Sequence, residues 1–167
     1  YAQNNGFGNS LTPISGRGND TLGYRYDFNL INVTGNVKFK LDQVEPTLLF
    51  DFVTNTAAEE DTVYDKTLGT SWLAGLSLKF MKMPVDWDLS YNYRDHQKDA
   101  AIGAFADSDP AGGGTNYNGH KASLGFNVMS GTRLAVTYYK NVKDPENASS
   151  ERQFAYDRVQ ADLELKF

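Results

Sequence analysis

The sequence predicts an all-β fold, an antiparallel transmembrane β-barrel of which about seven or eight strands are present. Residues 158–167 alternate strictly between polar and apolar side chains and end on Phe167, and similar segments precede them. A period of two residues indicates a strand with one apolar and one polar face. The connections between these segments are short and long in turn, as in outer-membrane barrels with short periplasmic turns and long extracellular loops.

The composition excludes several other classes of protein. The 167 residues include no Cys, which excludes a disulfide framework and thiolate metal sites. No apolar run approaches the roughly 20 residues that a membrane helix needs. The formal net charge is -5, and Lys and Arg are scattered singly along the chain, so we expect no nucleic-acid partner.

Residues 1–21 are predicted to be a loop or the remnant of a preceding barrel region, because Asn, Gly, Ser and Thr occur there without a sustained period. Residues 22–167 are predicted to form the strands of the barrel. The first strand alternates from Tyr24 onward and changes phase by one residue near Leu30. A β-bulge near residues 30–35 is the simplest explanation of that change.

The later strands follow from the same alternation, which recurs over residues 48–52, 72–80, 85–93, 122–128, 134–138 and 159–167. The expected periplasmic turns lie near residues 42–45, 82–84 and 130–132. The expected extracellular loops lie near residues 55–67, 96–118 and 144–152.

An odd number of strands leaves two unpaired edges, whereas single-chain bacterial barrels have even strand counts. Either an eighth strand lies in residues 1–15, or the chain is the carboxy-terminal part of a larger barrel of about 16 strands. We favour the second interpretation. The rest of the barrel, or another chain, is then expected to complete the wall.

Aromatic residues gather near the strand ends, where girdles at the two membrane interfaces are expected. The expected partners are therefore the lipid bilayer and lipopolysaccharide. The predicted girdle comprises Phe39, Trp72, Phe80, Trp87, Tyr91, Tyr93, Tyr138, Tyr156 and Phe167.

Several short motifs resemble the bacterial "putative porin" family of Gram-negative outer-membrane proteins. The most specific are Trp87-Asp88-Leu89-Ser90-Tyr91-Asn92-Tyr93-Arg94, Asp99-Ala100, Asp107-Ser108-Asp109, Gly113-Gly114-Thr115 and Gly119-His120. Tyr26-Asp27-Phe28, Tyr156-Asp157-Arg158 and Lys166-Phe167 are similar to the family as well. The resemblance implies a large barrel in the bacterial outer membrane, whose complete chains are longer, begin with a signal peptide and often form homotrimers.

The charged positions of the strands fall on the face opposite the apolar residues. If the barrel is wide, these residues line an aqueous pore and set its electric field. If it is narrow, they form salt bridges across a filled interior. The predicted pore-lining residues are Lys38, Lys40, Asp51, Lys79, Asp86, Asp88, Arg94, Lys121, Arg133, Arg158, Asp162, Glu164 and Lys166.

Loop 96–118 is long and rich in Gly, and it carries Asp107 and Asp109. It could fold inward as a constriction, bind calcium through the two carboxylates, or remain a plain surface loop. We expect no other cofactor. Asp95 and His96 suggest hydrolytic chemistry, but adjacent strand residues point to opposite faces, so we expect no catalytic residues and no enzyme.

The predicted function is an outer-membrane porin, a water-filled channel for passive diffusion of small hydrophilic solutes. The alternative is a structural outer-membrane barrel that acts as an anchor or scaffold for a surface assembly.

Overall fold

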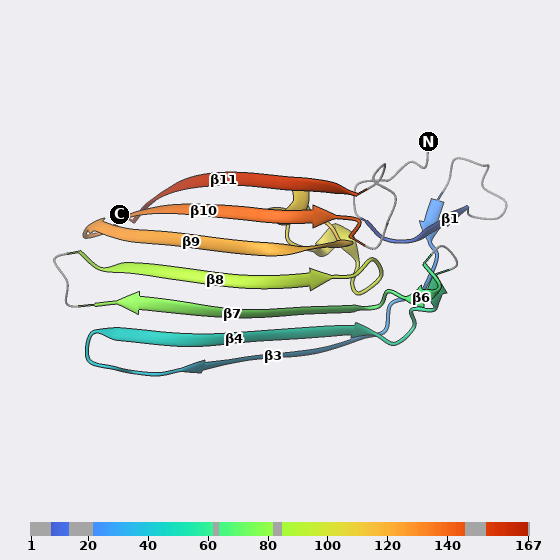
Figure 1. The fold of residues 1–167 in the computed structure, drawn as a ribbon, viewed down its shortest axis with the longest axis horizontal. Helices are drawn as coiled ribbons and strands as arrows, with labels where there is room; N and C mark the ends of the chain where they lie inside the picture. The colour runs from blue at the N-terminus through green and yellow to red at the C-terminus, as the bar shows by residue number, and fades with distance from the viewer. Residues whose placement is uncertain (1–7, 14–21, 62–63, 82–84, 146–152, 167) are drawn as a thin grey trace.

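The computed structural model describes residues 8–13, 22–61, 64–81, 85–145 and 153–166. Its main element is a seven-stranded antiparallel sheet, in which each long strand lies beside the next one along the chain, from β3 to β11 (Figure 1). The predicted all-β antiparallel fold class is confirmed. The seven strands are β3 (Leu30–Lys38), β4 (Val44–Asn55), β7 (Thr70–Phe80), β8 (Trp87–His96), β9 (Tyr117–Met129), β10 (Thr132–Lys143) and β11 (Phe154–Leu165).

Short connections lie at one end of the sheet, which we call the short-turn end (Figure 1). Ser130 and Gly131 join β9 to β10, and Gly131 has a φ of 76°, a conformation that side chains with a Cβ rarely adopt. The turn between β3 and β4 is closed by a hydrogen bond from the Leu41 N–H to the Val44 carbonyl (3.1 Å). The predicted turn at 82–84 lies outside the described residues.

Longer connections lie at the other end, together with two short hairpins (Figure 1). In these hairpins β1 (Leu11–Pro13) pairs with β2 (Leu22–Tyr24), and β5 (Glu60–Asp61) pairs with β6 (Lys66–Thr67). The connection from β8 to β9 contains the 3₁₀ turns η1 (Gly103–Phe105) and η2 (Pro110–Gly112). Among the described residues, no helix has the length and apolar character needed to cross a membrane.

The predicted bulge near residues 30–35 is wrong. β3 pairs with β4 without a register shift, from Leu30 opposite Asn55 to Lys38 opposite Thr47. The change of phase in the sequence has another cause: the residues up to Tyr24 belong to β2, which pairs with β1 and not with the large sheet. Residues 8–13, the described part of the stretch proposed for an eighth strand, contribute only β1.

A polar network joins three parts of the chain at the loop end, which we call the loop cap (residues 8–13, 56–61 with 64–69, and 97–116). Ser10 donates its N–H and its hydroxyl to the two carboxylate oxygens of Asp99, at 2.8 and 2.6 Å. The Lys98 ammonium pairs with Asp61 at 3.1 Å. Ser10, Asp61 and Asp99 are buried, so this network fixes the loops relative to one another.

Candidate functional site

The register of the sheet places the predicted pore-lining residues of the strands on one face, which we call the polar face. Tyr139 lies opposite Arg158 on β11 and Lys121 on β9, and Lys121 lies opposite Asn92 on β8. The same alternation brings to this face Lys38, Asp51, Lys79, Asp88, Arg94, Arg133, Asp162 and Glu164. Lys40, Asp86 and Lys166 lie just beyond the strand ends.

The exposure of the two faces is the reverse of that in a water-soluble sheet. On β10, Val136 is 50% exposed and its neighbour Thr137 is 6% exposed. The same contrast runs along the strand, where Leu134 and Tyr138 are exposed while Tyr139 is buried. In water, apolar side chains are expected inside and polar ones outside. The apolar face of this sheet therefore lacks a core of its own.

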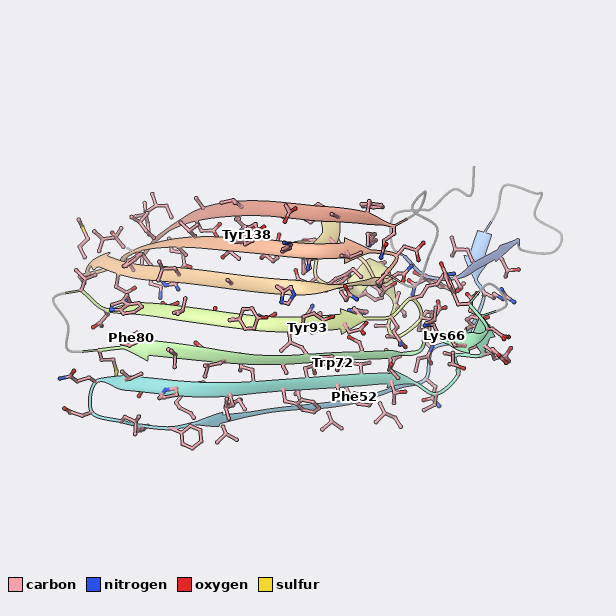
Figure 2. The ribbon with its side chains drawn as sticks, in the orientation of Figure 1. Phe52, Lys66, Trp72, Phe80, Tyr93 and Tyr138 are labelled. Atoms are coloured by element: carbon pink, nitrogen blue, oxygen red, sulfur yellow. The ribbon has the colours of Figure 1, made fainter. Side chains whose placement is uncertain are left out.

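Aromatic residues lie on the apolar face toward both ends of the strands. At the short-turn end Phe80 stacks on Trp87, with ring centroids 3.8 Å apart. Toward the loop cap Trp72 contacts Tyr93, with centroids 5.3 Å apart (Figure 2). Tyr91 and Tyr138 also lie on the apolar face, and Phe39 follows β3 with its side chain exposed.

One of the predicted girdle residues, Tyr156, differs from this arrangement. Tyr156 lies opposite Asn141, so it belongs to the polar face. Phe167 lies outside the described residues. The girdle predicted from the sequence does not include Phe52, although this residue lies opposite Trp72 on the apolar face (Figure 2). Its alternation with Asp51 and Val53 was the signal that could have identified it.

An ion-pair network spans four strands of the polar face. The Arg133 guanidinium donates through Nη2 to both carboxylate oxygens of Asp88, each at 2.8 Å, and through Nη1 to Glu164 at 3.2 Å. To reach Asp88, the Arg133 guanidinium passes over Gly125 of β9. A Cβ at residue 125 would lie 2.8 Å from Asp88 Oδ1. The charge of Arg133 is therefore matched by two acidic neighbours.

The connection from β8 to β9 folds onto the polar face. The Lys143 ammonium donates to the carbonyls of Gly113 (2.7 Å) and Thr115 (2.9 Å). The Ala111 N–H donates to Asn141 Oδ1 at 3.2 Å. The loop therefore rests on β10 and buries the polar side chains beneath it. Sequence reasoning missed Lys143 and Asn141, although both continue the alternation of the polar face.

Asp109 anchors the same loop to β11. Its Oδ1 pairs with Arg158 at 3.1 Å, and its Oδ2 accepts a hydrogen bond from the Tyr139 hydroxyl at 3.4 Å. Asp107 Oδ1 accepts the Asp109 N–H at 3.1 Å. No three His, Asp or Glu side chains within the described ranges are placed to hold a metal ion. Both carboxylates thus have hydrogen-bond or ion-pair partners within the protein.

Asp95 and His96 lie on opposite faces of β8. Asp95 lies opposite Trp72 on the apolar side, while His96 lies opposite Ser71 and Tyr117 on the polar side. His96 is buried beneath the loop. The two side chains do not form a common site, and this placement gives no support for hydrolytic chemistry.

The comparisons with known proteins agree with this architecture. The model of a family described as "Putative porin" matches residues 3–167, essentially the whole chain. No curated protein and no solved structure matches significantly. Because the family match covers nearly all of the sequence, the chain belongs to the "Putative porin" family.

Proposed function

We propose that the chain forms part of the wall of an outer-membrane porin, a water-filled channel for passive diffusion of small hydrophilic solutes. Its family indicates a porin-like, non-enzymatic role in a membrane. The observation that carries the proposal is the reversed exposure of the two faces. Exposed Leu, Val and Phe side chains on successive strands are stable against lipid and costly against water. The charged residues of the opposite face require an aqueous surrounding.

In this proposal the strands cross the bilayer between the two aromatic groups. Aromatic side chains favour the two membrane interfaces, where their rings meet both lipid and water. The short-turn end would face the periplasm, and the loop cap would face the exterior and contact lipopolysaccharide. The rule that supports this orientation is the sorting of short turns and long loops to opposite sides.

The loop over residues 97–116 would narrow the channel. Its contacts with Lys143, Asn141 and Arg158 hold it against the wall that we assign to the pore. A loop fixed in this way reduces the cross-section at one level and leaves the channel wide near Asp88 and Arg133.

The wall would be completed by further strands of a longer chain or by another chain. In the described part of the sheet, β3 and β11 each have a neighbour on one side only. An open strand edge in lipid leaves N–H and C=O groups without partners. Mass spectrometry of the intact natural protein is expected to give a mass well above the 18.6 kDa of this sequence. A mass equal to it would favour a small closed barrel.

Conductance of the full-length protein in planar lipid bilayers tests the channel itself. We expect discrete current steps in potassium chloride after incorporation. Protein that inserts into the bilayer, as shown by protease protection, and yet gives no steps would refute the channel. That result would favour a structural barrel that anchors a surface assembly.

A further inference from the structure

We call residues 97–116 the inward-folded loop. A cavity of about 60 Å³ lies between this loop and the polar face. Arg94 of β8 and Lys121 of β9 line it from the sheet, and Asp107 lines it from the loop. Asn92 and Asn141 add neutral polar groups to the same lining. A space of this size holds a few water molecules, or one carboxylate or phosphate group.

Arg94 and Lys121, the two cations of this cavity, differ in their partners from the other Arg residues of the polar face. Arg158 is paired with Asp109, and Arg133 is paired with Asp88 and Glu164. Arg94, by contrast, donates to the neutral hydroxyl of Tyr117 at 3.1 Å. Among the described residues, no ion pair joins Arg94 to a carboxylate.

Lys121 has a similar environment. Its ammonium lies 5.2 Å from the centroid of the Tyr139 ring, and no ion pair joins it to a carboxylate within the described ranges. Asp107 is the acidic side chain among the residues that line the cavity, and its Oδ1 already accepts the Asp109 N–H. Two positive charges therefore face one negative charge.

We propose that Arg94 and Lys121 form a subsite for a small oxyanion, a carboxylate or phosphate group, beneath the loop. The guanidinium offers two parallel N–H donors to a planar or tetrahedral oxyanion, and the ammonium adds a point charge. An anion there offsets the cost of holding two half-buried cations close together. This inference rests on the proposed function and defines its solute class: solutes that carry an oxyanion are retained at the constriction.

The first test is phosphate block of the channel. Inorganic phosphate, added to the full-length protein in planar bilayers in potassium chloride, is expected to lower the current along a saturating curve. R94Q and K121Q should each weaken the apparent affinity for phosphate about tenfold, equivalent to ~1.4 kcal/mol. K121R keeps the positive charge and should bind phosphate nearly as tightly as the unaltered protein. K79Q removes a lysine charge from the polar face near the short-turn end and should change the affinity less than twofold.

A linear response to phosphate, or an equal loss in K79Q and K121Q, would overturn the subsite and leave the channel standing. Such an equal loss would mean that only the general field of the wall acts on the anion.

The second test needs no conduction. Equilibrium dialysis of the detergent-solubilised full-length protein against radiolabelled phosphate is expected to show one bound phosphate per chain, displaced by excess acetate. R94Q and K121Q should lose this binding. Binding by a protein that does not conduct would refute the porin function and retain the subsite. Absence of binding by a protein that conducts would refute the subsite alone.

Discussion

Gly125 determines whether an arginine of β10 can reach an aspartate of β8. The Arg133 guanidinium and the Asp88 carboxylate meet directly above this glycine, at the position that a Cβ would occupy. The requirement for glycine is therefore set by a side-chain contact across the strand. Gly131, in contrast, is favoured by its positive φ, and a Cβ there would also lie 2.6 Å from the Lys166 carbonyl oxygen.

We predict that G125A uncouples Arg133 from Asp88. The two side chains are 30% and 27% exposed, so their coupling energy should be about 1 kcal/mol or less. The coupling energy can be measured by a double-mutant cycle of R133Q and D88N, using urea unfolding in lipid vesicles. We expect about 1 kcal/mol or less with Gly125 present, and a value near zero in the G125A background. G35A is the matched control, because a Cβ at Gly35 meets nothing within 4 Å. A coupling energy that G125A leaves unchanged would contradict the prediction.

The inward-folded loop shows how an element without regular structure can be fixed in place. Lys143 satisfies two loop carbonyls, and Asn141 satisfies the N–H of Ala111. Because the ammonium is buried, removing it leaves carbonyls without donors in a place that water reaches poorly.

We predict that K143M loosens this loop. Two lost hydrogen bonds at a buried site should destabilise the local structure by about 1–3 kcal/mol. Hydrogen exchange of the amides in residues 109–115 should therefore accelerate by about tenfold or more. The channel conductance should also rise, because the loop no longer stays against the wall. K140M is the control, since Lys140 lies on the same strand but on the other face; exchange that accelerates equally in both variants would contradict the role of Lys143.

The strands could be predicted from the sequence because their signal is local. Each residue of β8, β10 or β11 faces away from its neighbour, so polarity reports the face for most positions, such as Asp88, Arg133 and Glu164. Asp95, near the loop end of β8, is an exception on the apolar face. The positions of β2 and of the inward-folded loop could not be predicted in this way. They depend on contacts such as those of Ser10 with Asp99 and of Lys143 with Gly113, which join distant parts of the chain.

At the scale of the whole sheet, no other described segment covers the apolar surface, whereas the polar surface is partly covered. The environment, and not a hydrophobic core, must therefore stabilise the apolar side. This reversal makes the effects of mutation opposite to those expected for a soluble protein, and neighbouring residues of one strand offer a direct comparison.

We predict that L89R is strongly destabilising while S90R is tolerated. Leu89 is 41% exposed on the apolar face, where an arginine near the bilayer midplane costs about 2–4 kcal/mol. Ser90 lies opposite Ser77 and Ser123 on the polar face, and these small side chains leave room for a long one. Urea unfolding of both variants in lipid vesicles measures the difference. A soluble protein would tolerate L89R at its exposed position, so equal stability of the two variants would exclude a lipid-facing apolar side.

In the proposed orientation the loop cap lies outside the cell, and the buried Ser10–Asp99 network then affects how antibodies would recognise the protein. This network joins Ser10 to Asp99, 89 positions later in the sequence, so the structure around these two residues combines distant stretches of chain. An antibody that binds around these two residues would recognise a discontinuous epitope. Residues 97–103 are all buried or half-buried. Antisera raised against a linear peptide of residues 97–103 should therefore detect the denatured protein on a blot and fail to label intact cells.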